Sequence, residues 1–233
     1  MSTPRPDLTT LSPEEKRRLL AERLRRKADQ PARHPLSSSQ ERLWFLDRFE
    51  SGSPLYNIAS AFRLRGALEI DALENSLREI ARRHSVLRAS FHARRGEPEM
   101  LISPDVSPAL ALRDLTTLPP EAREDAAEEE ANREAKAPFD LEKSPLLRCT
   151  LLKLAEREHV LIFVIHHIIS DGWSQVVLFR ELAAAYNAII EGKMPSLPPL
   201  PIQYTDYIDW QKQRLSGGTL DRMLEFWKGA LGE

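Results

Sequence analysis

Residues 163–174 read FVIHHIISDGWS, and they join an apolar run to two adjacent histidines, an aspartate, a glycine and a tryptophan. The apolar residues before the histidines are continuous, which is typical of a strand that is buried on both faces. From Trp173 onward the apolar residues recur at helical spacing and predict one buried stripe, namely Val176, Phe179, Ala183, Tyr186 and Ile190. We therefore expect a buried strand, a polar turn and a helix in succession.

The two histidines are expected to differ in role, because successive strand residues face opposite sides of a sheet. One of His166 and His167 can pack inward while the other faces a cleft. Asp171 can reach back across the turn or pair with a cation elsewhere. Gly172 permits a tight bend or the close approach of a ligand.

The spacing of these residues leaves three interpretations open. A metal site is one, although the histidines lack the i, i+4 helical spacing of zinc proteases and no cysteine ligand lies nearby. A structural pair held by hydrogen bonds in the core is the second. In the third, His167 is a general base, because a neutral imidazole can take a proton from an attacking amine or hydroxyl near neutral pH.

The rest of the chain alternates predicted helices and strands without a regular order. Helices are predicted over residues 12–28, 38–49, 69–84, 121–136, 203–215 and 219–231. The apolar face of the helix over 69–84 comprises Leu73, Leu77, Ile80 and Ala81. Strands are predicted over 56–66, 109–115, 146–154 and 159–167, with two more around an Arg-Gly-Glu-Pro turn within 86–103. This pattern indicates an α/β fold with a mixed sheet packed with helices.

Three segments are expected to lie at the margins of this fold. Residues 1–34 are interpreted as an N-terminal linker or docking helix ahead of a domain over 35–233, with 29–35 as the linker itself. The acidic stretch over 121–136 is interpreted as a solvated helix face without a function. Residues 195–201, PSLPPLP, are expected to form an extended connector.

Composition excludes several classes of protein. The chain has 233 residues and a formal net charge of −2, so it lacks the basic excess that a nucleic-acid partner would require. It contains neither an apolar run of about 20 residues nor the apolar core of a signal peptide, which favours a cytoplasmic protein without a membrane partner. The single cysteine, Cys149, lies in the apolar stretch LLRCTLL and is expected to be a buried structural thiol.

Four segments together resemble motifs of the condensation domains of nonribosomal peptide synthetases. They are LSSSQERLWFL at 36–46, RRHSVLRASF at 82–91, HHIISDGWS at 166–174 and YTDYIDWQ at 204–211, in the order of the family's motifs. The histidine motif alone is shared in shortened form with chloramphenicol acetyltransferase. The residues of this motif are most similar to those of the subtype that joins two L-configured residues. The second motif departs from the family at Ser85, where a glutamate is usual.

The resemblance implies a fold and a set of site residues. The fold would be one half of a pseudo-dimer of two chloramphenicol-acetyltransferase-like α/β subdomains, with the active site in a tunnel between them. His167 would be the base or the orienting group for the acceptor amine, and His166 would be structural. Asp171 would hold the turn through a salt bridge to Arg83 or Arg88. Gly172 would leave room for substrate and offer its N–H to the oxyanion, and Trp173 would support the site.

The resemblance also implies partners and a reaction. Both substrates would arrive on the phosphopantetheine arms of upstream and downstream peptidyl carrier proteins, with no cofactor bound to the domain itself. A C-terminal subdomain and an adenylation domain would complete the module, in the synthesis of an antibiotic or another secondary metabolite. Because whole domains of this family are longer, we expect this chain to be the N-terminal subdomain, inactive alone. Alternatives are a non-catalytic carrier-docking module and a stand-alone acyltransferase for a small alcohol or amine.

Overall fold

The computed structural model describes residues 31–50 and 52–232. The helix expected over residues 12–28 lies outside these residues. Residues 32–34, expected to belong to a linker, instead form β1 (Ala32–His34), which pairs antiparallel with β4 (Glu97–Ile102). This end of the expected linker is therefore part of the folded body.

The larger sheet has four strands and contains the histidine-bearing strand at its interior. Its order is β2 (Asn57–Arg65), β7 (Glu158–His166), β6 (Leu147–Ala155) and β5 (Leu110–Asp114). The first three strands are antiparallel, whereas β5 runs parallel to β6. Every residue of β7 from His159 to His166 is buried, as its continuous apolar run predicted. The mixed sheet expected from the sequence is confirmed.

The smaller sheet has the order β1-β4-β3 and comes from the predicted hairpin. β3 (Ala89–Arg94) pairs with β4 across a turn in which Arg95 and Gly96 have φ values of 54° and 89°. Phe91 and Met100 of this sheet are fully buried in the same apolar cluster as Phe163 of β7. The two sheets therefore share one core.

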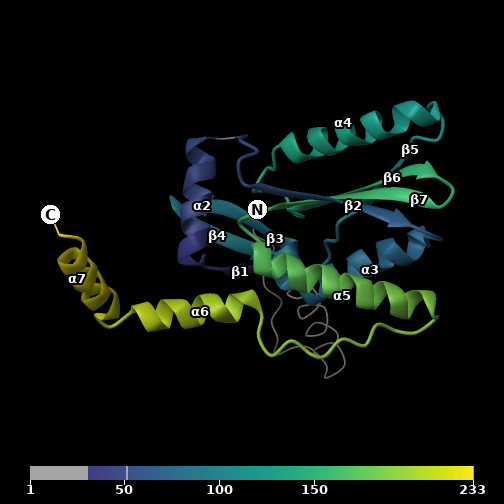
Figure 1. Cartoon of the computed structure of the whole chain (residues 1–233). Coiled ribbons are helices and arrows are strands. Elements are labelled where there is room, and N and C mark those ends of the chain that lie inside the picture. Colours follow the sequence, from purple (N-terminus) through teal and green to yellow (C-terminus); the bar gives the residue numbers. More distant parts are fainter. Residues whose placement is uncertain (1–30, 51, 233) are drawn as a thin grey trace, which may run out of the picture.

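Helices cover both faces of the larger sheet (Figure 1). α3 (Ile70–Arg83) and α5 (Gly172–Ile190) pack on one face, and α4 (Arg123–Lys136) packs on the other. The predicted apolar face of α3 is confirmed, because Leu73, Leu77, Ile80 and Ala81 are all buried. α4 buries Ala127 against β6 and β7, so it is more than the solvated helix that its acidic composition indicated.

The buried face of α5 matches the predicted stripe only at Phe179 and Tyr186, which pack against the core. Val176 is 61% exposed, and Ala183 and Ile190 are exposed as well, while the residues that α5 buries are Leu178, Glu181, Leu182 and Ala185. The stripe is displaced because Glu181 is turned inward, where it pairs with Arg83 of α3. Apolar spacing cannot anticipate a carboxylate that is buried by its partner.

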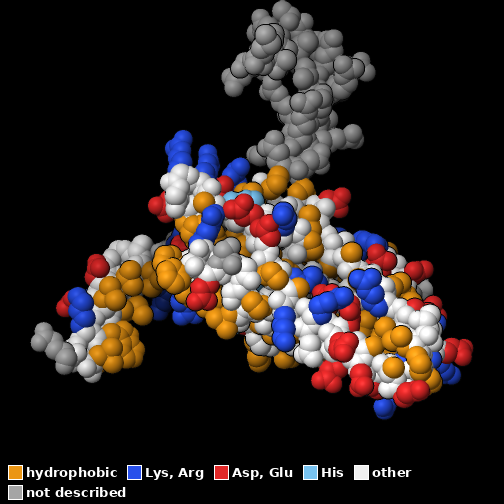
Figure 2. Space-filling model, turned by 90° about the horizontal axis from the view of Figure 1, so that it is seen from above, with side chains coloured by type: hydrophobic (Ala, Val, Ile, Leu, Met, Phe, Trp, Pro, Cys, Tyr) orange, Lys and Arg blue, Asp and Glu red, His pale blue; other side chains and the backbone are white. Residues whose placement is uncertain are grey.

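The other helices complete the described part of the chain. α2 (Ser38–Phe49) matches its prediction, and the 3₁₀ turns η1 (Ser85–Arg88) and η2 (Pro120–Ala122) precede β3 and α4. After the extended connector, α6 (Tyr204–Leu215) and α7 (Thr219–Leu231) lead away from the body (Figure 1). α7 buries no residue, and hydrophobic side chains gather on this arm (Figure 2). No helix in the described ranges is long and apolar enough to cross a membrane.

Candidate active site at the end of strand β7

The alternation of β7 gives its last residue and the residue after it opposite environments. Ile162 and Val164 belong to the apolar cluster under α4, whereas Phe163 and Ile165 belong to the cluster that includes α3 and α5. His166 follows in the first series and is 2% exposed. His167 follows in the second series and is exposed. The two histidines therefore face opposite ways, as the alternation predicted.

His166 is enclosed by aromatic rings and is a structural residue. Its ring centroid lies 6.3 Å from that of Tyr56 and 6.0 Å from that of Phe139, the latter edge to face. Its Nδ1 accepts the backbone N–H of Ile168 at 3.1 Å. Burial, and to a lesser extent repulsion from His167, lowers the pKa of His166 to about 4. The imidazole is therefore neutral at physiological pH.

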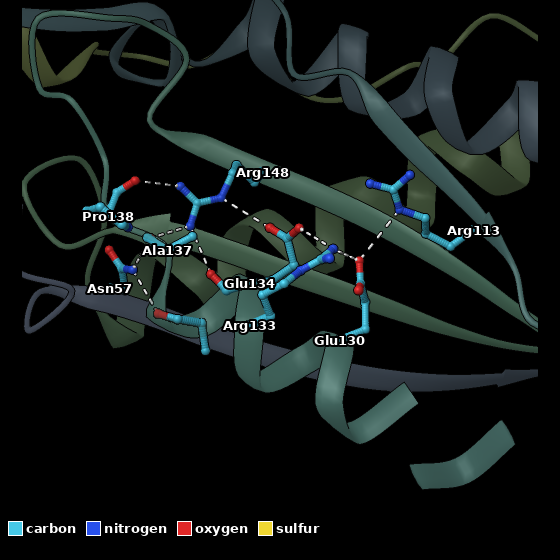
Figure 3. Close-up of polar contacts among 9 residues, drawn as sticks. Asn57, Arg113, Glu130, Arg133, Glu134, Ala137, Pro138 and Arg148 are labelled. Carbon is cyan, nitrogen blue, oxygen red and sulfur yellow. Dashed lines mark hydrogen bonds and ion pairs between the residues drawn. The ribbon is translucent and has the colours of Figure 1, made fainter. Parts of the chain in front are cut away.

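Arg148 supports Phe139, one of the rings around His166, and Figure 3 shows the contacts of Arg148 at the end of α4. The guanidinium carbon of Arg148 lies 3.9 Å from the centroid of the Phe139 ring. Arg148 also donates to carbonyls at and just after the end of α4, those of Glu134 at 2.9 Å, Ala137 at 2.7 Å and Pro138 at 3.3 Å. Asn57 of β2 donates to two carbonyls of the same turn, both at 2.8 Å. Because helix ends leave carbonyls without partners, these donors attach α4 firmly to the sheet.

His167 has one ring nitrogen engaged. Its Nδ1 lies 2.8 Å from the carbonyl oxygen of Ser170, and its backbone N–H donates to the carbonyl of Tyr56 at 2.8 Å. A carbonyl can only accept, so Nδ1 carries the proton and donates it. In the neutral ring Nε2 is then an acceptor with a lone pair, which is the state that a general base requires.

His167 lines a cavity of about 640 Å³. The walls come from α2, Tyr56 just before β2, η1, the turn after β7, the first half of α5 and residues 200–207. Polar groups gather near the histidine, including Ser170, Asp171 and Ser174, while Val177, Leu178 and Leu200 contribute apolar surface. The cavity joins residues from all four sequence motifs at one place.

Asp171 holds the start of α5. Its Oδ1 accepts the backbone N–H of Ser174 at 2.7 Å and the Ser174 hydroxyl at 2.6 Å, as the N-cap of a helix does. These hydrogen bonds lower the pKa of Asp171, so the carboxylate is ionised. The predicted salt bridge to Arg83 or Arg88 is wrong, because neither guanidinium contacts Asp171 in this structure. The carboxylate finds its partners within its own helix instead.

The two arginines support the site from elsewhere. Arg83 pairs with Glu181 at 2.8 Å, with side chains that are only 12% and 8% exposed, and the Nε2 of His84 lies 2.7 Å from the same carboxylate. Burial raises the pKa of Glu181, but the hydrogen bonds from Arg83 and His84 together lower it by more. The pKa of Glu181 is therefore below its ordinary value. This cluster joins α3 to α5. Arg88 donates to the carbonyls of Ala81 and Pro104, both at 3.1 Å.

Gly172 and Trp173 begin α5 at the mouth of the cavity. The backbone of Gly172 does not have a positive φ, and a Cβ placed there would meet nothing within 4 Å, so the expected tight bend is not the reason for this glycine. The absence of a side chain at Gly172 leaves open space beside the turn. Trp173 is 79% exposed and lines the cavity, so it does not support the site by packing in the way that the resemblance implied.

Two residues near the site escaped the sequence analysis. Glu181 gave a signal, since it is a lone carboxylate within the apolar run VVLFRELAAAY. Gln40 is buried and donates to the backbone of Ile168, although nothing in its spacing marked it. Cys149 is buried as expected, and burial raises the pKa of its thiol. The described residues contain no group of three His, Cys, Asp or Glu side chains placed to hold a metal ion.

Comparison with known proteins relates this chain to one family. A family model described as Condensation domain matches residues 31–233. One of the linear gramicidin synthase proteins of Brevibacillus parabrevis is 45% identical over 198 residues, which cover 85% of this chain and 3% of that protein. Phosphinothricin tripeptide synthetase of Streptomyces viridochromogenes is 41% identical over 203 residues, 87% of this chain and 19% of that protein. The chain thus spans a small part of these relatives.

Solved structures show the same fold. The X-domain from teicoplanin biosynthesis is 34% identical with a TM-score of 0.75, over 86% of this chain and 43% of that one. The starter condensation domain of rhizomide synthetase has a TM-score of 0.78 at 22% identity, over 87% of this chain and 48% of that one. The predicted fold class is confirmed, and the chain covers less than half of each solved chain. With the four motifs meeting at one cavity, the predicted resemblance is confirmed: the chain belongs to the condensation domain family.

Proposed function

We propose that this chain is the histidine-bearing half of a condensation domain that forms a peptide bond between two carrier-bound substrates. The observation that carries this proposal is the state of His167. Its Nδ1–H is held by the carbonyl of Ser170, so Nε2 is free to accept a proton at the wall of the cavity. His166, in contrast, is enclosed and neutral, and its role is structural.

The reaction is an aminolysis of a thioester. The α-amine of the acceptor attacks the carbonyl carbon of the donor thioester, and the new C–N bond forms as Nε2 of His167 takes the amine proton. The C–S bond then breaks, and the thiolate of the donor arm takes the proton to become a thiol. General base catalysis supplies about 10²–10⁴-fold, so orientation of the amine by the same nitrogen accounts for part of the rate.

The start of α5 is suited to the charge that develops in this reaction. Helix N-termini present backbone N–H groups and a positive partial charge, and Asp171 caps only the N–H of Ser174. The N–H groups of Gly172 and Trp173 precede it, in the first turn, where α5 itself offers no carbonyl acceptor. We assign them to the oxyanion of the tetrahedral intermediate, which a glycine without a Cβ lets approach closely.

The partners follow from this reaction. Upstream and downstream peptidyl carrier proteins would deliver both substrates on phosphopantetheine arms, so the domain itself needs no cofactor. A C-terminal subdomain would form the opposite wall of the tunnel, and an adenylation domain would load the acceptor. We place the protein in the cytoplasm, in the synthesis of an antibiotic or a related secondary metabolite, and assign it to the subtype that joins two L-configured residues.

The test is a reconstituted assay of dipeptide formation. Loaded donor and acceptor carrier proteins are mixed with the complete condensation domain, and the product is measured by mass spectrometry at single turnover. The 233-residue chain alone is expected to be inactive, because water reaches an open half-site. Equal rates for the wild type and His167→Gln would overturn the proposed role of the histidine.

A docking module remains the second candidate, because one 34% identical relative of known structure forms a complex with another protein. That relative is the X-domain from teicoplanin biosynthesis, solved together with OxyB. A docking module would bind its partner equally well with His167→Ala and would form no peptide bond. The exposure of His167, together with the hydrogen bond from its Nδ1 to the Ser170 carbonyl, favours the catalytic function.

A further inference from the structure

We propose that Gln40 is a positioning residue for His167 and acts through the backbone of the turn after β7. The inference rests on the proposed function of His167. Gln40 belongs to the first sequence motif, and its side chain contacts the turn formed by the third. It would keep the imidazole in the protonation form that catalysis requires.

The side chain of Gln40 is buried and fully engaged. It is 1% exposed, and its Nε2 donates to the carbonyl of Ile168 at 3.2 Å. Its Oε1 accepts the backbone N–H of Ser37 at 3.1 Å, and Nε2 also lies 3.9 Å from the sulfur of Met100. A buried amide with these partners has one orientation, because turning it over would place Nε2 against the N–H of Ser37.

The contacted carbonyl belongs to the peptide between Ile168 and Ile169, in the middle of the turn after β7, and the N–H of this peptide donates to the carbonyl of His166 at 3.1 Å. The N–H of Ile168 donates to Nδ1 of His166, and the carbonyl of Ser170 accepts Nδ1–H of His167. Gln40 therefore holds the peptide between these two contacts. If this peptide rotated, the Ser170 carbonyl would leave Nδ1, and the proton would be free to move to Nε2. An Nε2–H imidazole cannot accept the proton of the amine.

Gln40 is itself held by the fourth motif. The hydroxyl of Ser37 accepts the backbone N–H of Gln40 at 3.2 Å and lies 3.0 Å from the hydroxyl of Tyr204 at the start of α6. Gln211 of α6 accepts the N–H of Ser38 at 3.0 Å. A path of hydrogen bonds thus runs from α6 through the start of α2 to the turn that carries His167.

The test measures the tautomer of His167 directly. The 233-residue chain is labelled with ¹³C and ¹⁵N histidine, and the His167 signals are assigned with His167→Gln. We expect the Nδ1–H form in the wild type and a shift to the Nε2–H form, or a mixture, in Gln40→Met. In the complete domain, Gln40→Met is expected to lower kcat about 10- to 100-fold with little change in KM, as for a misplaced catalytic group.

Control variants separate positioning from helix capping. Ser37→Ala removes the cap and the Tyr204 contact but leaves both side-chain hydrogen bonds of Gln40, whose partners are the backbone N–H of Ser37 and the carbonyl of Ile168. It is therefore expected to lower the urea midpoint and to keep the Nδ1–H form of His167. Gln211→Glu alters a contact at the same end of α2 and does not contact the turn after β7. In this variant the tautomer of His167 is expected to match that of the wild type. Should Gln40→Met fail to fold, Gln40→Asn keeps the amide but is one methylene too short to reach Ile168.

The outcomes are distinct from those of the proposed function. A folded Gln40 variant that retains the wild-type tautomer would overturn the positioning role, whatever the activity of the domain. Loss of the Nδ1–H form in Ser37→Ala as well would assign the effect to the helix cap and would also overturn it. The proposed function, in contrast, fails only if His167→Gln forms dipeptide at the wild-type rate.

Discussion

At the end of β7, each face of the sheet carries a histidine, but the two histidines lie in different environments. On one face His166 is buried between Tyr56 and Phe139, and burial lowers its pKa to about 4. On the other face His167 lines a cavity with its Nδ1–H bound to a carbonyl. The comparison teaches that the end of one strand can bury one histidine in the core and place its neighbour at a cavity, because alternate side chains point to opposite faces of the sheet.

The largest effect is expected from His167→Gln in the complete domain. The amide cannot accept the amine proton at neutral pH, so kcat should fall about 10²–10⁴-fold. Because His167 is exposed, the free energy of unfolding should change by less than about 0.5 kcal/mol. Single-turnover kinetics and urea unfolding measure the two quantities. A large loss of stability would contradict the assigned contrast between the two faces.

The next largest effect is the change of protein stability with pH that results from the lowered pKa of His166. The unfolded chain binds a proton at this imidazole below pH about 6.5, whereas the folded chain does not until about 4, so the folded state loses stability as the pH falls through this window. The free energy of unfolding falls by about 3 kcal/mol once the pH is below both the unfolded and the folded pKa of His166. Urea unfolding from pH 7 to pH 4 measures it.

The matched variant for this prediction is His166→Leu, which cannot titrate. Its stability should be less steep over the same pH window, and the difference between the two curves isolates His166 from His159, whose pKa is also lowered by burial. If the curves of the wild type and the variant run parallel from pH 7 to pH 4, His166 is not held in its neutral form.

A smaller effect is expected from Arg148→Lys on the wall behind His166. The Arg148 guanidinium donates from three nitrogens to three carbonyls and to the Glu134 carboxylate, and its central carbon lies over the Phe139 ring. A lysine ammonium has its three donors on one nitrogen and cannot reach all of these groups, so about 1–2 kcal/mol of stability should be lost. Arg113→Lys is the control, because Arg113 is exposed and only reaches Glu130 at 3.6 Å, and it should cost less than about 0.5 kcal/mol. Equal losses in urea unfolding would contradict the role assigned to Arg148.

The smallest effect separates the cap from the charge of Asp171. Asp171→Ala removes the acceptor of the Ser174 N–H and should destabilise the protein by about 1 kcal/mol, whereas Asp171→Ser keeps a capping oxygen and should recover most of this loss. Thermal unfolding of both variants of the 233-residue chain measures the difference. Equal destabilisation by both substitutions would mean that the negative charge, rather than the cap, is what α5 requires.

Local patterns predicted most of the elements, because each depends on neighbours in sequence. The apolar run of β7, the face of α3 and the turn at Gly96 all formed as expected. The alternation of a strand also predicted that His166 and His167 would differ. It could not say which of them faces the cavity, since that depends on where α4 and α5 lie.

Pairings between distant residues were not predictable in the same way. Arg83 was expected near Asp171, but it lies against Glu181 on α5, and Asp171 caps its own helix instead. The displaced stripe of α5 has the same origin, because Glu181 is buried only in the company of Arg83 and His84. Sequence spacing alone therefore does not predict which distant residue a buried charged side chain pairs with.

The sequence by itself determined the family, the order of the motifs and the presence of a polar turn between a buried strand and a helix. These are properties of periodicity and of short residue patterns, which survive without knowledge of the fold. Only the tertiary structure decided that Gln40 donates to the carbonyl of Ile168 and that all four motifs border one cavity. Hydrogen bonds act over about 3 Å, and side chains more than one hundred residues apart reach that distance only through the packing of the whole core.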